Sequence, residues 1–210
     1  MKHDIKQSNE SPMSGYLKHT ISFVAGFLIA IFAEPLQHFL FRPALHLEFI
    51  GSPAKDSPYL LDTPDRSDSA TYNSRWLRIS VRNVSRHTAI GCRAFITKIE
   101  RKNDSGEYIT FDHDALPLTW AYLGTGKQDL PPDLNLFFDL IHYSERNDSL
   151  RFSASATPNI WLPYLAKPGV FRLTVAVFGD NVSVYRETVE VTWKGGMNLT
   201  ASTSVDNSLR

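Results

Sequence analysis

The chain has 210 residues, of which 42% are hydrophobic and 12% aromatic, enough apolar material for a folded domain with a core. Lys+Arg and Asp+Glu each number 22, so the formal net charge is zero. Three charges of each sign lie in residues 1–41, which leaves 19 of each sign in the remainder. Phosphate binding usually needs a basic excess, so this balance argues against a nucleic acid as a main partner.

The first predicted element is a membrane-spanning helix at residues 21–41, preceded by a flexible polar segment at 1–20. Residues 21–33 carry no charge, and 39–41 (Phe-Leu-Phe) extend the apolar stretch beyond Glu34. A bilayer core takes about 20 helical residues, and polar groups near its edge can reach toward the headgroups. The stretch therefore predicts a single-pass membrane protein that contacts lipid through residues 21–41.

Two alternatives to a spanning helix remain open. A cleaved signal peptide would end in small residues followed by polar chain, whereas residues 39–41 continue the apolar run. An interfacial helix would carry a basic polar face, which residues 21–33 lack. Three lysines (Lys2, Lys6 and Lys18) precede the stretch, whereas two basic residues (Arg42 and Lys55) follow it. This excess of one positive charge before the helix favours a cytoplasmic N-terminus, with the C-terminal domain on the extracytoplasmic side.

Residues 45–193 are predicted to form a β-domain, because polar and apolar residues alternate with a period of two. In a strand at 75–82, one face carries Leu77, Ile79 and Val81, and the other carries Arg78, Ser80 and Arg82. Two later strands have apolar faces formed by Phe171, Leu173, Val175 and Val177 and by Tyr185, Val189, Val191 and Trp193. Further strands are predicted at 45–50, 92–100, 107–111, 136–143 and 150–156. Many short strands separated by turn residues predict an all-β fold, an antiparallel β-sandwich.

Two stretches are predicted to lack regular structure. Residues 51–74 contain three prolines and many Ser and Asp residues, which predicts a long polar loop, either functional or disordered. Residues 194–210 contain Gly-Gly followed by Ser, Thr and Asn, which predicts a disordered tail. Cys92 is the single cysteine of the chain, so an intrachain disulfide is impossible.

Two segments of the β-domain resemble a known family. Residues 81–94 (VRNVSRHTAIGCRA) resemble the V-x-N-x-G-x-x-x-A-x-x-V turn of bacterial immunoglobulin-like modules of the CARDB, or cell-adhesion-related, type. Residues 167–175 (KPGVFRLTV) resemble the P-G-x-Y-x-L-x-V start of a late strand in such sandwiches. Ser85 stands where Gly is usual, and Phe171 replaces the Tyr that would form a tyrosine corner. The resemblance implies an immunoglobulin-like sandwich and an adhesion or interaction module, with no catalytic residues to carry over.

The sequence contains no familiar catalytic motif: no H-E-x-x-H, no G-x-S-x-G, no phosphate-binding glycine loop and no Cys/His ligand spacing. Asp112-His113-Asp114 has the residue types of a metal or base site. Adjacent residues on a strand point to opposite faces, however, so a solvated turn explains this cluster better. We therefore expect no catalytic residue, no metal and no cofactor, and an anchored hydrolase ranks below two binding functions.

The first candidate binding site is basic. Residues 69–99 contain six Lys or Arg and no Asp or Glu, whereas residues 128–150 contain five Asp or Glu and one Arg. One interpretation is an anion-binding face formed by Arg78, Arg82, Arg86 and Arg93, which would bind an acidic protein partner or anionic headgroups. The alternative is that these basic residues pair across strands with the acidic segment.

The second candidate site is aromatic. Trp120 and Trp161, together with Tyr122 and Tyr164, would form a sugar-stacking platform if they were exposed, and would be core residues otherwise. The sequence thus predicts a membrane-anchored, non-catalytic binding or assembly module, with a carbohydrate-binding surface module as the alternative.

Overall fold

The computed structural model describes Phe27 and residues 42–48, 60–67, 70–111, 114–124, 126–154 and 162–203. The chain divides into two compact units, Met1–Phe41 and Arg42–Arg210. Apart from Phe27, the predicted flexible segment and membrane helix lie outside the described residues. No helix within the described ranges is both long and apolar enough to cross a bilayer.

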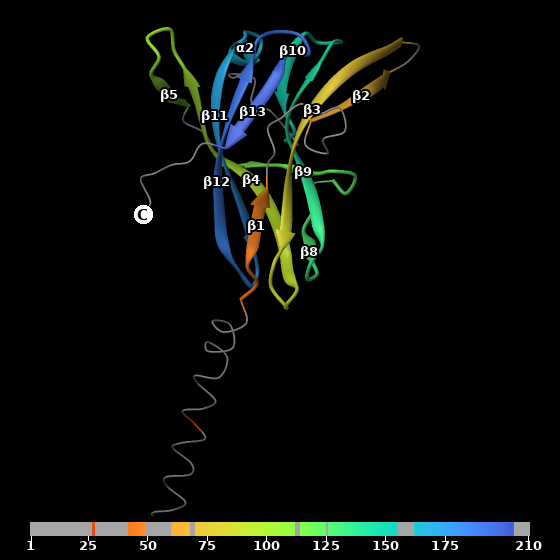
Figure 1. The fold of residues 1–210 in the computed structure, drawn as a ribbon, viewed down its shortest axis with the longest axis vertical. Helices are drawn as coiled ribbons and strands as arrows, with labels where there is room; N and C mark the ends of the chain where they lie inside the picture. The colour runs from red at the N-terminus through yellow and green to blue at the C-terminus, as the bar shows by residue number, and fades with distance from the viewer. Residues whose placement is uncertain are drawn as a thin grey trace, which may run out of the picture. The chain divides into compact units, whose positions relative to one another are not determined.

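The second unit is an all-β domain of two antiparallel sheets that are arranged like a sandwich (Figure 1). One sheet consists of β1 (Leu45–Glu48), β2 (Leu60–Ser67), β3 (Ala70–Asn83), β7 (Thr119–Trp120), β9 (Asn135–Ser144) and β10 (Ser149–Phe152). β3 and β9 form its centre. β1 and β2 pair along one edge of β3, and β7 and β10 pair along the far edge of β9.

The other sheet consists of β4 (Ala89–Lys102), β5 (Tyr108–Phe111), β6 (Leu116–Pro117), β8 (Gln128–Leu130), β11 (Gly169–Gly179), β12 (Val182–Trp193) and β13 (Leu199–Thr203). Its strands follow the order β13-β12-β11-β4, and β5, β6 and β8 pair with successive parts of the remaining edge of β4. A short helix, α2 (Leu162–Leu165), precedes β11. The connection from β3 to β4 therefore crosses from one sheet to the other.

The predicted inner faces of the strands are confirmed. Side chains at 77, 79, 81, 173, 175, 177, 189 and 191 are fully buried, and Phe171 and Trp193 are nearly so. Tyr185 is partly buried against the same core. The outer face of β3 is less exposed than alternation predicts, because the small side chain of Ser80 lies between its pairing partners Glu48 and Phe137.

β2 lies within residues 51–74, the stretch predicted to be a long polar loop. The segment has no hydrophobic alternation, but its backbone pairs with β3 from Leu60 opposite Leu77 to Ser67 opposite Ala70. Pro64 is compatible with this position because an edge strand leaves one side of its backbone unpaired. The loop prediction therefore differs from the structure at residues 60–67 and 70–74, where backbone pairing between β2 and β3 rather than side-chain pattern defines the strands.

β13 lies within the predicted disordered tail. Gly195 and Gly196 have φ values of 96° and 54° and form the turn between β12 and β13, and Gly196 accepts a hydrogen bond from the Trp193 indole at 2.9 Å. Leu199 is fully buried on β13. The two glycines thus form a tight turn between paired strands rather than the start of a loose linker, because glycine adopts positive φ without strain. Residues 204–210 lie outside the described residues.

Asn83 is a fully buried polar residue at the end of β3. Its amide nitrogen donates to the carbonyls of His87 and Leu130, both at 2.7 Å. Its amide oxygen accepts from the backbone N–H of Ser85 at 3.0 Å and from the Ser85 hydroxyl at 2.7 Å. The side chain therefore ties the β3–β4 loop to β8, a more specific role than the tolerance of turn conformations that Asn offers in general.

We predict that Asn83→Ala lowers the free energy of unfolding by about 2–4 kcal/mol, because it removes the Asn83 donor from the buried Leu130 carbonyl and one of the two donors to the His87 carbonyl. Asn147→Ala, in the exposed turn between β9 and β10, is the control and should change stability by less than about 0.5 kcal/mol. Denaturant unfolding of the purified chain measures both. Equal stability of the two variants would contradict a structural role for the Asn83 amide.

Candidate functional site

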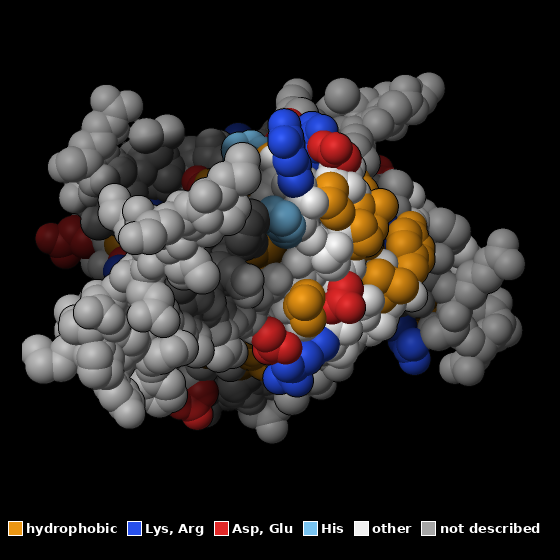
Figure 2. Space-filling model, turned by 90° about the horizontal axis from the view of Figure 1, so that it is seen from below, with side chains coloured by type: hydrophobic (Ala, Val, Ile, Leu, Met, Phe, Trp, Pro, Cys, Tyr) orange, Lys and Arg blue, Asp and Glu red, His pale blue; other side chains and the backbone are white. Residues whose placement is uncertain are grey.

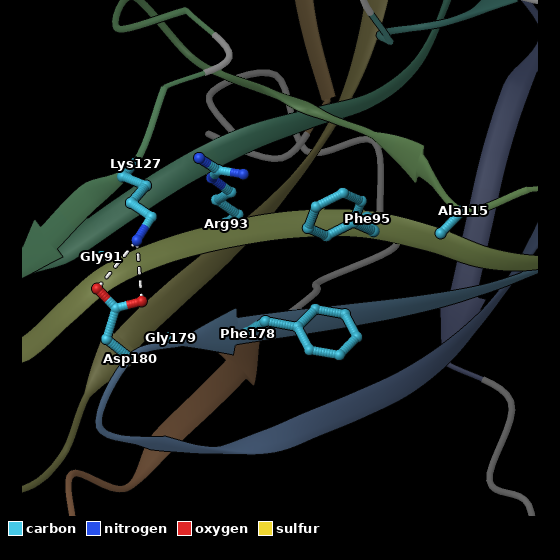
Figure 3. A pocket seen from close by; sticks show the side chains of 8 residues that line it. All are labelled: Gly91, Arg93, Phe95, Ala115, Lys127, Phe178, Gly179 and Asp180. Atoms are coloured by element: carbon cyan, nitrogen blue, oxygen red, sulfur yellow. Dashed lines mark hydrogen bonds and ion pairs between the residues drawn. The ribbon is translucent and has the colours of Figure 1, made fainter.

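A pocket of about 440 Å³ opens on the sheet that contains β4 and β11. Its lining residues are Gly91, Arg93, Phe95, Ala115, Lys127, Phe178, Gly179 and Asp180. Figure 3 shows Arg93 and Phe95 along β4, Phe178 on the neighbouring β11, and Lys127 reaching Asp180 from the segment before β8. The volume falls within the range of small-ligand or side-chain binding pockets, about 300–1,000 Å³.

The floor of the pocket is aromatic. The rings of Phe95 and Phe178 meet edge to face, with centroids 5.5 Å apart and an interplanar angle of 84°. Both side chains are only partly buried, and they lie on adjacent strands on the opposite side of the sheet from core residues such as Val177. Aromatic groups on an outer sheet face offer apolar contact area to a ligand.

One wall of the pocket depends on Gly91, which is buried and has a φ of 64°. A Cβ atom at this position would lie 2.5 Å from Oδ2 of Asp180, so any side chain would displace that carboxylate. Asp180 accepts two hydrogen bonds from Lys127 Nζ, at 2.9 and 3.0 Å. Glycine at 91 therefore permits the Lys127–Asp180 ion pair that closes this side of the pocket.

Arg93 supplies the charge that the pocket leaves available. Lys127 is neutralised by Asp180, and the carboxylate of Asp129 accepts the Gly91 N–H at 2.8 Å. Arg93 is exposed, and within the described residues no ion pair or hydrogen bond of its guanidinium is found. A planar guanidinium matches a carboxylate through two parallel hydrogen bonds, so the pocket offers an apolar floor beside an anion-binding group.

The structure does not bring the four predicted arginines together on one face. Arg78 and Arg82 lie on β3 in one sheet, Arg93 lies on β4 in the other, and Arg86 lies in the loop between these strands. Arg82 forms an exposed ion pair with Asp133 at 3.2 Å. Arg78 pairs with Asp139 at 2.5 Å, and both side chains are about 90% buried. These two pairs are those expected from the cross-strand alternative.

Arg78 is covered by Tyr122, which follows β7 with a φ of 67°. The phenol oxygen accepts a hydrogen bond from Arg78 at 3.2 Å, and the guanidinium carbon lies 4.9 Å from the ring centroid. Burial raises the pKa of Asp139 above its ordinary value, although the hydrogen bond and charge of Arg78 act in the opposite direction. The Arg78–Asp139 pair is therefore a partly desolvated structural contact, and Arg78 offers little charge to a ligand.

The described aromatic candidates do not form an exposed platform. Trp120 is 1% exposed and packs edge to face on Phe138, with ring centroids 5.8 Å apart, so its face is not available to a sugar. Tyr122 is exposed but lies over Arg78, and Tyr164 packs on Phe111. Trp161 lies outside the described residues. The core interpretation of Trp120 is thus correct, because the aromatic ring fills space between the sheets.

A second pocket, of about 380 Å³, lies near the other end of β4. Its lining residues are Arg101, Lys102, Asn103, Asp104, Ile109, Phe111, Tyr164 and Lys167. Arg101 donates to the Pro168 carbonyl at 3.1 Å and lies over the Phe171 ring, and Lys102 lies over the ring of Tyr108. Two of the three cations in this pocket are thus engaged by the domain itself, unlike Arg93.

Groups with catalytic potential are few in the described part of the chain. No cluster of three metal-ligating side chains occurs there. Asp112 and His113 lie outside the described residues, and His142 stacks on Trp76 at 4.0 Å. Burial and the nearby charges of Asp129 and Asp180 raise the pKa of the Cys92 thiol to about 11, which keeps it protonated at neutral pH.

Of the pocket residues, only Arg93 belongs to the basic face predicted from the sequence. Phe95 and Phe178 carried a usable signal, because each is a large apolar residue in the outward frame of its strand. Lys127 and Asp180 carried none, since their pairing joins segments 53 residues apart in the chain. Comparison of the chain with known protein families gives no match, and a search of curated proteins finds no significant relative.

We predict that Arg78→Met destabilises the domain by about 2–4 kcal/mol at neutral pH, because it leaves the Asp139 carboxylate buried without its partner. The pKa of Asp139 is raised in the folded state, so protonation of this group at low pH adds to the free energy of unfolding. This contribution is lost as the pH rises through the folded-state pKa. The loss caused by Arg78→Met should therefore shrink as the pH falls. Arg82→Met, which breaks an exposed pair, is the control and should cost less than about 1 kcal/mol. A similar loss in both variants, independent of pH, would contradict this account.

Proposed function

We propose that this chain is a membrane-anchored, non-catalytic binding module, and that the pocket beside Arg93 binds an apolar segment of an acidic protein partner. The observation that carries the proposal is the exposed guanidinium of Arg93, which has no ion-pair partner among the residues that the structure describes, next to the Phe95–Phe178 floor. The aromatic rings supply apolar contact area, and the guanidinium selects a carboxylate beside it. Ligand pockets commonly combine an apolar lining with a few placed polar groups in this way.

The membrane anchor is the second part of the proposal. The uncharged stretch 21–33 and the apolar residues that follow it support a spanning helix at 21–41. Lysines before this stretch favour an extracytoplasmic position for the domain. The resemblance of residues 81–94 to CARDB-type modules supports an immunoglobulin-like sandwich that takes part in adhesion or assembly. A carbohydrate-binding function is less well supported, because Trp120 is buried.

We predict that the full chain stays with membranes after an alkaline carbonate wash, whereas residues 42–210, expressed alone, form a soluble β-domain. The reason is that the described residues of the second unit form a core of their own, from Leu45 to Ala201, which needs no lipid. Sedimentation, circular dichroism and mass spectrometry of the N-terminus provide the measurements. Release of the full chain by carbonate would contradict the anchor, and loss of residues 1–41 in the mature protein would support the signal-peptide alternative. A reporter fused after Arg210 then determines which side of the membrane the domain occupies.

The pocket is tested with a matched pair of peptides, acetyl-Phe-Glu-Leu amide and acetyl-Phe-Gln-Leu amide, added to isotope-labelled residues 42–210. The amide signals of Gly91 and Gly179 lie in the pocket wall and report occupancy by NMR. We expect the glutamate peptide to shift both signals and to bind at least about fivefold more tightly than the glutamine peptide, because only a carboxylate pairs with the guanidinium. Should the isolated domain fail to fold, the full chain in detergent micelles serves instead.

Two variants give this titration its control. Arg93→Gln should remove the preference for glutamate, whereas Arg82→Gln, which changes an equally charged arginine on the other sheet, should leave it intact. Increasing salt should weaken binding of the glutamate peptide to the unaltered domain. Equal shifts by both peptides, or the same effect of both substitutions, would refute the assignment of this pocket.

A further inference from the structure

The end of the domain at which β1 begins carries a group of exposed apolar and basic side chains, which we call the junction surface. It consists of Arg42, Val84, Arg86, Leu134 and Val184. The three apolar members are 53%, 43% and 43% exposed, in chain order. Figure 2 looks onto this end and shows hydrophobic side chains gathered there, with Lys, Arg and acidic groups beside them.

Short contacts between four segments bring the junction surface together. The Val84 N–H donates to the Ala44 carbonyl at 2.9 Å, which places the β3–β4 loop beside the start of β1. The backbone of Asn83 bonds to Asp133 and Leu134 in the β8–β9 loop. Arg42 donates to the hydroxyl of Ser183, the residue before Val184, at 3.3 Å. These loops are therefore fixed around the point where residues 1–41 join the domain.

The side chain of Asn181 adds a further link at this end. Its oxygen accepts the Ile90 N–H at 2.8 Å, and its nitrogen donates to the Thr88 carbonyl at 2.9 Å. The β11–β12 turn is thereby attached to the start of β4, as the β3–β4 loop is attached to β8 by Asn83. The apolar side chains are thus displayed by a rigid set of turns, and exposing them costs hydrophobic stabilisation that a lipid contact would restore.

The charges of this end favour an anionic surface. Of the acidic groups here, Asp133 pairs with Arg82 and Asp180 pairs with Lys127. Asp129 remains exposed and accepts one backbone hydrogen bond. Arg42 and Arg86 form no ion pair with the described residues, so their charges remain available. Basic residues next to a membrane anchor are attracted to anionic headgroups, and apolar side chains beside them enter the interface.

We propose that the junction surface lies on the anionic headgroup layer of the membrane, an inference that rests on the proposed anchor at residues 21–41. Arg42 follows the predicted span directly, and two residues of chain reach at most about 7 Å, so Ala44 and its neighbour Val84 stay close to the lipid. The domain is then seated on the bilayer rather than held away from it by a linker. The Arg93 pocket, whose lining includes Asp180 of this end, would then lie near the headgroup layer.

The test places single cysteines in the full chain at Val84, Leu134 and Asn147 and labels them with the fluorophore NBD. Asn147 lies beyond the far end of β9, and a ten-residue strand separates it from Leu134 by about 30 Å. The buried Cys92 thiol, with its pKa raised to about 11, should not label at neutral pH, and the unsubstituted chain checks this. If it does label, Cys92→Ala provides the background. The chain is reconstituted in vesicles of phosphatidylcholine and phosphatidylglycerol, with or without phosphatidylcholine that is spin-labelled at the headgroup.

We expect headgroup spin labels to quench NBD at positions 84 and 134 at least about twofold more than at 147. Arg42→Gln combined with Arg86→Gln, or vesicles of phosphatidylcholine alone, should reduce this difference. Equal quenching at all three positions, in chains that float with the vesicles, would show that the junction surface does not lie on the headgroups. The proposed membrane anchor would still be supported in that case. Chains that fail to float with the vesicles would overturn the anchor and this inference together. Strong quenching that persists without anionic lipid and without both arginines would refute the charge component.

Discussion

The buried amide of Asn83 is the contact on which the arrangement at one end of the domain depends. It joins the end of β3 to Leu130 on β8, and thus links the two sheets where the chain crosses between them. β8 in turn follows Lys127, whose ammonium group holds Asp180 against Gly91. The sandwich core alone would leave these loops free to move, because their side chains are mostly exposed. The satisfied, buried amide of Asn83 therefore contributes to the position of both the pocket wall and the junction surface, together with the Asn181 amide and the backbone bonds at this end.

The sequence predicted the parts of the fold that depend on local pattern. Alternation located the core faces of β3, β11 and β12, since each strand buries one side against the opposite sheet. β2 was missed because it is an edge strand, held by backbone pairing with β3 and by the Asp62–Arg75 ion pair rather than by an apolar face. β13 was missed because Gly-Gly is equally typical of a linker and of a tight turn. In both cases the deciding partner lies elsewhere in the chain, where no local pattern records it.

For charged residues too, the sequence shows which segments are basic or acidic but does not show which side chains pair in the fold. The basic cluster at 69–99 and the acidic cluster at 128–150 are real features of the sequence, and Arg78 and Arg82 of the first pair with Asp139 and Asp133 of the second. Linear spacing gave no indication that the chain changes sheets between Asn83 and Ala89. Because of this crossing, Arg93 lies on β4 in the second sheet, where no acidic side chain of the described residues is within ion-pair distance of it. Arg86 and Arg93 are thus the arginines of the basic cluster without an ion pair in the described residues, and only the topology places Arg93 beside the aromatic pair on the second sheet.

A membrane-seated module would need little intrinsic affinity. One guanidinium and two partly buried aromatic rings give a modest contact area, which suits a weak and reversible interaction more than a tight one. If the anchor holds the domain and its partner in the same bilayer, the partner's effective concentration rises without any new contact. The rigid turns around Asn83 and Asn181 would add to this effect, because a fixed orientation of the pocket reduces the freedom lost on binding. Loops held by the amides of Asn83 and Asn181 beside the proposed anchor, and a small pocket with one guanidinium available, are thus two features consistent with a protein that would act by its position on a membrane.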